Sequence, residues 1–276
     1  MATFDTLSFP PMKNLIKIAC CAAALSGMTS AARALSGSGV SYTAPAGLND
    51  PGWANVGSIV GTVGSVVYLG DYSGGYWVLS VAHVGIGNSS SVVLNGTTYA
   101  VLSGSIVPIT NAGGSVADLV LFRVAGDSAL ASLARLTVSS STPALNASVT
   151  QIGYGGGAES IGSTTVTAVG SSPSTIDGGA HNTYFFQSRS TTVQTITGDS
   201  GGAVFRKSGS DWILSGLMQA TGDDSGYHYT QSVDLSKYVS QINGYILAAV
   251  PEPSTYGILG AGTLALAAAI RRRRAA

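Results

Sequence analysis

Short runs of β-forming residues, gathered in two groups, constrain the fold of this chain more than any other feature. The first group occupies about 57–125 and the second about 146–246, with a connector at 126–145 between them. Turn residues separate the runs, and Asn95-Gly96 between two of them is a strong hairpin signal. Each group offers six runs, which is enough strands to close a small barrel. The sequence therefore predicts an all-β body made of two six-stranded antiparallel barrels.

Alternation of apolar and polar residues sets the expected strand ranges. In the first group they are 58–63, 65–69, 76–81, 91–94, 97–102 and 119–124. In the second group they are 148–153, 163–169, 184–187, 203–206, 212–220 and 228–233. We expect one helical turn at 129–136, and a closing helix at 234–246 with Asp234 as its N-cap. Residues 35–55, which are rich in Ser, Gly and Pro, predict an extended N-terminal arm.

The stretch Thr197–Gly202 places Ser200 between an acid and two glycines. A serine needs a base to remove its proton before it can act as a nucleophile at neutral pH. Glycines beside it allow a tight turn and let a substrate carbonyl approach the main chain. The backbone N–H groups of Gly198 and Ser200 would then converge on a developing oxyanion. The same run also fits a plain polar turn, so the choice between the two depends on a histidine and a second acid elsewhere.

Both partners are present in suitable contexts. An apolar run, 76–82, leads directly into His83, and Asp118 stands at the head of the apolar run 119–122. The segments around His83, Asp118 and Ser200 resemble the three signature segments of the trypsin/chymotrypsin-like serine proteases, "AAH", "DIAL" and "GDSGG". The chain order is that of this family, whereas triads on other folds use other orders. The resemblance covers about residues 55–245.

The resemblance implies a fold and a set of residue roles. It implies two six-stranded barrels, a C-terminal helix, and catalytic groups in the cleft between the barrels. His83 would be the general base, Asp118 its partner and Ser200 the nucleophile of a serine endopeptidase. The backbone N–H groups of Gly198 and Ser200 would form the oxyanion hole. Protein or peptide would be the substrate.

Two further positions take their meaning from the resemblance. Gln194, six residues before Ser200, would lie at the base of the primary specificity pocket, where a neutral amide offers no counter-charge for Lys or Arg. Asp199 would pair with an amine that zymogen cleavage frees, but no Ile-Val-Gly-Gly start follows a basic residue, so the activation route stays open. Asp223-Asp224 is expected to be a solvated turn, or else the rim of the substrate cleft.

The first 34 residues read as a secretory signal. Lys13 and Lys17 flank a short apolar core, and Ala32-Arg33-Ala34 fits a small-x-small cleavage site. An N-terminal anchor helix is the alternative, but polar residues interrupt the segment too early to span a bilayer. The only cysteines of the chain, Cys20 and Cys21, lie here. The body, 35–249, would then have no disulfide, and Val84 and Ile196 stand where the resembled family has cysteines.

The C-terminal segment 250–276 combines Val250-Pro251-Glu252-Pro253, an apolar run at 256–270, and four arginines at 271–274. As a helix, the apolar run with Thr255 would extend for about 24 Å, slightly short of an average bilayer. The arginines would remain on the cytoplasmic side. The tail resembles the PEP-CTERM sorting signal of Gram-negative bacteria, which implies recognition by an exosortase, membrane attachment during sorting, and a final place at the cell surface or outside the cell. A plain single-span anchor is the alternative.

Composition narrows the remaining classes. Charged residues make up 9% of the chain, and the body alone keeps six basic and eleven acidic residues, a net charge near −5. It has no basic patch, which argues against a nucleic-acid partner. With three histidines and no cysteine in the body, no metal site is expected. His181 and His228 are expected to be structural, and no cofactor is implied.

Two other functions remain open at this point. The first is a non-catalytic trypsin-like surface or matrix protein that uses the cleft only to bind. The second is a structural β-rich protein associated with exopolysaccharide, which would explain the tail but not the three segments.

Overall fold

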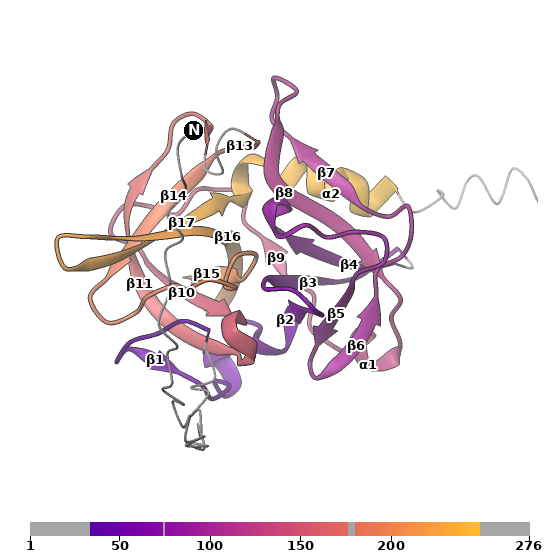
Figure 1. The fold of residues 1–276 in the computed structure, drawn as a ribbon, viewed down its shortest axis with the longest axis horizontal. Helices are drawn as coiled ribbons and strands as arrows, with labels where there is room; N and C mark the ends of the chain where they lie inside the picture. Colours follow the sequence, from indigo (N-terminus) through magenta and orange to yellow (C-terminus); the bar gives the residue numbers. More distant parts are fainter. Residues whose placement is uncertain (1–33, 74, 176–179, 249–276) are drawn as a thin grey trace, which may run out of the picture. The chain divides into compact units, whose positions relative to one another are not determined.

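Strands in two large sheets dominate the part of the chain that the structure describes (Figure 1). The structure is a computed structural model, and it describes residues 34–73, 75–175 and 180–248. These residues belong to one of two compact units, Ala31–Ala276. The other unit, Met1–Ser30, lies outside the described residues, and so does the tail after residue 248.

The N-terminal sheet has the order β6-β5-β2-β3-β4-β8-β7. An isolated bridge between Val101 and Val124 joins the β6 end of this sheet to β8, so six of its strands form a ring. β7 lies outside that ring and pairs with β8. The strands are β2 (Val56–Ile59), β3 (Ser65–Tyr72), β4 (Gly75–Ser80), β5 (Ser91–Leu94), β6 (Thr97–Ala100), β7 (Val107–Thr110) and β8 (Val116–Val124).

The C-terminal sheet is a closed six-stranded barrel, β11-β10-β15-β16-β17-β14, because β14 also pairs with β11. Two short strands join it from outside, β1 on β11 and β9 on β16, and β12 and β13 form a separate pair. The strands are β1 (Val40–Ser41), β9 (Thr137–Val138), β10 (Ser148–Gly153), β11 (Ser160–Val169), β12 (Ser174–Thr175), β13 (Asn182–Thr183), β14 (Phe185–Ser190), β15 (Ala203–Ser208), β16 (Asp211–Asp224) and β17 (Tyr227–Asp234).

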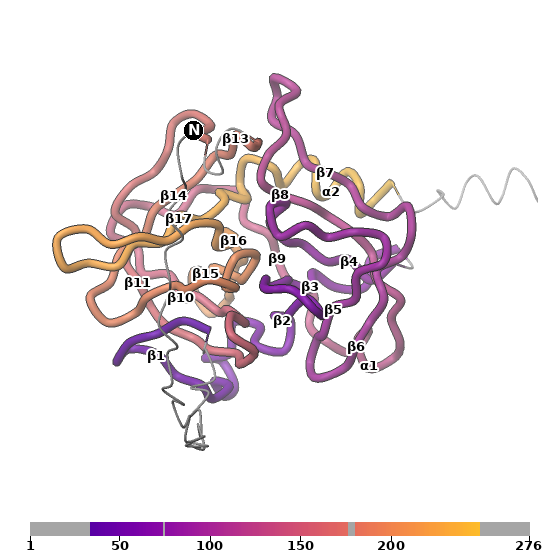
Figure 2. Tube along the Cα trace, in the orientation of Figure 1, coloured from indigo at the N-terminus to yellow at the C-terminus, as the bar shows by residue number. Residues whose placement is uncertain are grey.

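The helices are short, and α2 (Val239–Ala248), labelled beside β7 in Figure 2, is the longest of those in the described residues. The other α-helix is α1 (Ser128–Ala131). The 3-10 turns are η1 (Gly47–Asn49), η2 (Trp53–Asn55), η3 (Ala82–Val84), η4 (Gly155–Gly157) and η5 (Leu235–Lys237).

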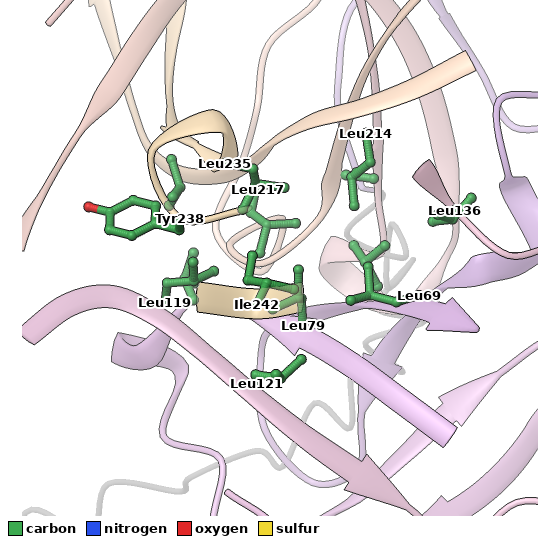
Figure 3. Packing of buried hydrophobic residues seen from close by; sticks show 14 of the residues in the cluster. Leu69, Leu79, Leu119, Leu121, Leu136, Leu214, Leu217, Leu235, Tyr238 and Ile242 are labelled. Carbon is green, nitrogen blue, oxygen red and sulfur yellow. The ribbon is translucent and has the colours of Figure 1, made fainter. Parts of the chain in front are cut away.

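The largest apolar core joins the two barrels. β8 shows how: Leu119 and Leu121 pack in this joint core, whereas Val120 and Phe122 pack inside the first barrel. Successive side chains of a strand point to opposite faces, so a run with no polar alternation is buried on both sides. Ile242 of α2 completes the joint core, together with leucines from both sheets (Figure 3). The junction that carries the candidate site is therefore backed by rigid apolar packing.

The predicted all-β fold with two barrels and a closing helix is confirmed, with local corrections. The first strand runs over 56–59 rather than 58–63, because the chain turns at Gly61 with φ 77°. The sequence did not predict β7, because that strand contains Pro108, which has no backbone N–H to donate to a β-ladder. Proline is nevertheless compatible with an edge strand, which β7 is. The helical turn is 128–131 rather than 129–136. Asp234 caps η5 through the Ser236 N–H, and α2 begins only at Val239.

The N-terminal arm is docked on the second barrel. Leu35 is fully buried among the apolar residues inside the second barrel, and β1 extends the sheet beside β11. The arm was expected to be extended but nothing in its composition predicted docking. Its attachment places the start of the expected exported body next to the serine loop.

Candidate active site

His83 and Asp118 meet where the first barrel adjoins the second. Ser80 pairs with Val120 in the β4–β8 ladder, which brings the end of β4 beside the start of β8. His83 then lies in η3, and its backbone N–H donates to Asp118 Oδ1 at 2.9 Å. Its ring Nδ1 lies 2.7 Å from Asp118 Oδ2. A carboxylate at Nδ1 favours the tautomer that carries the proton there, which leaves Nε2 as the acceptor.

Asp118 is buried and held in place from both its side chain and its backbone. Its side chain is fully buried, while that of His83 is 28% exposed. The Asp118 backbone N–H donates to the Thr183 hydroxyl at 2.7 Å, which ties the start of β8 to β13. Thr183 was not singled out from the sequence, because a threonine in a two-residue strand carries no local signal. A buried carboxylate with two charge-assisted contacts can stabilise an imidazolium without moving.

Ser200 lies in the turn between β14 and β15, and this turn needs its glycines. Gly198 and Gly201 have φ values of 100° and 89°. A Cβ at Gly201 would stand 2.1 Å from the Ser65 carbonyl oxygen, and one at Gly198 would stand 2.9 Å from Gly155 Cα. The two glycines therefore serve both the left-handed backbone and the close approach of neighbouring main chain.

Ser65 connects this turn to the first barrel. Its N–H donates to the Ser200 carbonyl at 2.7 Å, and its hydroxyl donates to the Gly198 carbonyl at 2.9 Å. Ser80 in turn donates to the Ser65 carbonyl at 2.7 Å, three residues before His83. The structure thus brings the loop of Ser200 against the strand that delivers His83. Ser65 was missed from the sequence, because its role depends on contacts more than 130 residues away.

Asp199 is a buried carboxyl surrounded by backbone donors. It accepts from the N–H groups of Ile196 at 2.8 Å, Leu35 at 3.0 Å and Gly155 at 3.1 Å. Burial raises the pKa of Asp199 to about 6, although the three N–H groups act in the opposite direction. No cation among the described side chains pairs with it. The contact with Leu35 is notable, because Leu35 is the first residue of the predicted exported body.

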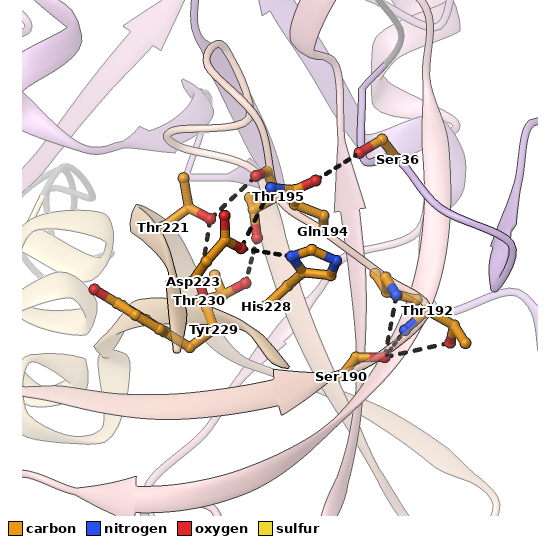
Figure 4. Close-up of polar contacts among 11 residues, drawn as sticks. Ser36, Ser190, Thr192, Gln194, Thr195, Thr221, Asp223, His228, Tyr229 and Thr230 are labelled. Atoms are coloured by element: carbon orange, nitrogen blue, oxygen red, sulfur yellow. Dashed lines mark hydrogen bonds and ion pairs between the residues drawn. The ribbon is translucent and has the colours of Figure 1, made fainter. Parts of the chain in front are cut away.

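Gln194 lies between β14 and β15 in a polar cluster (Figure 4). Its backbone forms an isolated bridge with Ser36 of the N-terminal arm, and its Oε1 accepts from the Ser36 hydroxyl at 3.3 Å. Its Nε2 donates to Asp223 Oδ1 at 3.5 Å, and His228 contacts the same oxygen. His228 was expected to be structural and Asp223 to be a solvated turn or a rim residue, and the two prove to be partners.

The described residues hold neither a cluster of metal-ligating side chains nor a membrane-spanning helix. Across residues 34–73, 75–175 and 180–248, no three His, Cys, Asp or Glu side chains gather as metal ligands would. Within the same ranges no helix is both long and apolar enough to cross a bilayer. The tail helix expected at 255–270 lies outside them.

The fold and the site together define a class: proteins with two β-barrels and a histidine, a buried aspartate and a serine loop near the barrel junction. A family model of the trypsin-like peptidase domain matches residues 52–211, more than half of the chain. The chain belongs to the trypsin-like peptidase family. A second model, the PEP-CTERM protein-sorting motif, matches residues 249–274. Both resemblances drawn from the sequence are thereby confirmed.

Solved structures support the same fold. The chain is similar to the inactive form of the protease Rv3671c from Mycobacterium tuberculosis, with 16% identity and a TM-score of 0.51 over 70% of this chain and 89% of that one. It is also similar to a serine-to-alanine mutant of the same protein, with 17% identity and a TM-score of 0.54 over 74% of this chain and 97% of that one. No curated protein sequence matches the chain.

The sorting motif has consequences of its own. It indicates export in a Gram-negative bacterium with passage through the membrane, and recognition of the tail by an exosortase. The peptidase domain, in turn, implies peptide substrates.

Proposed function

We propose that the protein is a serine endopeptidase that hydrolyses peptide bonds through Ser200, His83 and Asp118. The observation that carries this proposal is the pair of contacts from His83 to the buried Asp118, which leaves Nε2 of the ring as a proton acceptor. Ser65 of β3 binds the Ser200 loop, and Ser80, at the end of the strand that leads to this ring, donates to the Ser65 carbonyl. The serine, the base and the carboxylate thus have the chain order and local surroundings that acyl transfer requires.

The chemistry follows from these roles. His83 Nε2 takes the Ser200 hydroxyl proton as Oγ attacks the substrate carbonyl, and the backbone N–H groups of Gly198 and Ser200 stabilise the oxyanion. The amine then leaves with the proton from His83, and an acyl-enzyme remains. Water, deprotonated by the same imidazole, hydrolyses this ester and restores Ser200. Asp118 stabilises the imidazolium throughout.

A fluorophosphonate probe tests the proposal directly. The purified protein should label at Ser200, and the Ser200→Ala variant should not. A wild-type protein that folds and neither labels nor cleaves casein-derived peptides would instead support the non-catalytic surface protein.

Processing at both ends is part of the proposal. We expect export to leave a body that begins near Leu35 and ends near Pro251, because both flanks carry removal signals. Intact-mass measurement on protein from the medium and the cell surface checks both ends. The tail helix, 255–270, would anchor the protein in the inner membrane only until the exosortase acts. Recovery of fully exported protein that still carries residues 256–274 would contradict this order of events.

The identity of Gln194 leads to a prediction about the side chain that the enzyme prefers at the cleaved bond. If its amide lies at the base of the primary pocket, we expect cleavage after uncharged side chains, because an amide cannot supply the carboxylate that Lys or Arg needs. Cleavage of a diverse peptide library, read by mass spectrometry, measures the preference. A profile dominated by Lys and Arg at the cleaved bond would refute it.

A further inference from the structure

Two adjacent cavities begin beside the end of α2, and none of the proposed catalytic groups lines them. The smaller, about 210 Å³, lies between β3, the connector and α2, where Tyr72 and Ile246 line it. The larger, about 560 Å³, lies between the N-terminal arm, the connector and the β15–β16 turn. Leu136 and Thr137 line both cavities, so the two are adjacent, and we call them together the connector groove.

Arg135 stands at the boundary of the two cavities. It lines the larger one, and its guanidinium carbon lies 4.9 Å from the centre of the Tyr72 ring, which lines the smaller one. The Tyr72 hydroxyl donates to the Leu136 carbonyl at 3.2 Å, and Leu136 packs with Leu69 in the joint core (Figure 3), so this part of the groove is rigid.

The guanidinium of Arg135 is available to a carboxylate from outside the described residues. Arg135 is exposed, and no carboxylate of the described chain forms an ion pair with it. Among the described residues that line the two cavities, it is also the only cation. An arginine stacked on an aromatic ring keeps the N–H groups at its edge, which bind a carboxylate in a bidentate manner.

The other charges of the groove limit what it can hold. Asp50 and Asp211 also line the larger cavity. Asp50 Oδ1 accepts from the N–H groups of Gly52 and Trp53 at 2.8 and 2.7 Å, which hold it in its own turn. A ligand with several negative charges would be repelled by these carboxylates. The groove therefore fits a largely apolar peptide that carries a single acid.

The chain itself supplies such a peptide next to the groove. The described residues end at 248, two residues after Ile246, and Val250-Pro251-Glu252-Pro253 follows. Glu252 is the only charged residue between Lys237 and Arg271. Each proline fixes its own φ and favours an extended conformation of the residue before it. Six residues separate Ile246 from Glu252, so the carboxylate reaches as far as about 20 Å from the smaller cavity.

We propose that the connector groove holds the segment 249–254 of the chain's own sorting signal, with Glu252 paired with Arg135. Extended proline-containing segments bind grooves with aromatic walls because they lose little conformational entropy on docking. Tyr72 and Trp212 supply such walls here. The body then shields the Pro-Glu-Pro stretch until the exosortase displaces it from the groove.

Two spin labels on one chain test the docking by pulsed EPR distance measurement. The full chain is purified in detergent from a host without an exosortase. Cys20→Ala and Cys21→Ala leave the introduced cysteines as the only thiols, and Ser200→Ala prevents self-digestion. Labels at Ser254→Cys, beside the Pro-Glu-Pro stretch, and at Thr98→Cys, exposed on β6 and outside the groove, should give one narrow distance distribution.

Charge reversal tests the ion pair. Arg135→Glu and Glu252→Arg each place like charges together, and each should broaden the distribution about threefold, because a released segment samples the distances of a flexible linker. The two changes combined should restore the narrow distribution. Arg123→Gln is the matched control, because Arg123 also stacks on a ring, 5.6 Å from the Trp77 centroid, but lines neither cavity. Thermal unfolding verifies that each variant is folded.

Three outcomes would overturn the inference. The first is a broad distribution in the protein with both native charges. The second is a narrow distribution that neither charge reversal disturbs. The third is loss of the narrow distance in an excess of unlabelled protein, which would mean that the tail of a second copy occupies the groove. Failure of the proposed peptidase activity would appear instead as absent fluorophosphonate labelling of the protein that retains Ser200, on which these distances do not depend.

Discussion

Replacing Ser200 or His83 with alanine should each lower peptide hydrolysis by about a million-fold, and the double replacement should be scarcely worse. The losses do not add, because a serine without its base and a base without its serine are equally unable to form the acyl-enzyme. Asp118→Asn should cost about ten-thousand-fold, because the amide favours the wrong imidazole tautomer. Initial rates on a peptide ester and a peptide amide measure all four proteins.

The controls for this series come from the other histidines and the oxyanion loop. His181→Ala should retain turnover, since His181 has no place in the mechanism. Gly198→Val should lower turnover more than substrate affinity, because a Cβ there would press on Gly155 and displace the N–H of the oxyanion hole. Near-wild-type hydrolysis by Ser200→Ala, with persistent fluorophosphonate labelling, would refute the triad.

Removal of the N-terminal secretory signal should raise kcat/KM for peptide hydrolysis about a hundredfold. A cut between Ala34 and Leu35 would turn the Leu35 nitrogen, 3.0 Å from Asp199 Oδ2, into an α-ammonium group. Such a group is charged at neutral pH and would pair with the buried Asp199 carboxylate. Leaving that carboxylate without its charged partner, as in the uncut chain, costs about 3–5 kcal/mol of folding free energy. The variant Ala32→Glu, which removes a small residue of the expected cleavage site, supplies the uncut chain. Its kcat/KM is compared with that of the processed protein and of processed Asp199→Asn.

The pH dependence of stability gives an independent readout of the same contact. In the uncut chain the folded pKa of Asp199, about 6, exceeds its ordinary value of 3.8, so the folded state binds the proton more tightly than the unfolded state. Stability should therefore fall as pH rises from about 4 to about 6. The processed protein should lose this slope, because the ammonium stabilises the carboxylate. Equal slopes in cut and uncut protein, measured as Tm against pH, would contradict the pairing.

The sequence by itself determined the two-barrel fold and the candidate residues of the site. Runs of alternating apolar and polar residues joined by short turns require antiparallel strands. The segments around His83, Asp118 and Ser200 are local patterns that can be recognised without any knowledge of packing. The PEP-CTERM tail is of the same kind, because its signal is a contiguous stretch. Element ends were less well predicted: α2 begins at Val239 rather than 234, because the Asp234 cap closes a 3-10 turn first.

Only the tertiary structure decided which distant groups meet. Ser65 supports the loop of Ser200, and Thr183 anchors Asp118, through hydrogen bonds whose partners lie 65 residues or more away. The sequence predicts only an extended arm from Leu35, yet burial of Leu35 among the apolar residues of the second barrel brings its nitrogen to Asp199. Asp223 and His228 become partners only because the ladder of β16 and β17 sets them opposite each other. Local pattern specifies strands and motifs, whereas strand register and barrel closure specify these contacts.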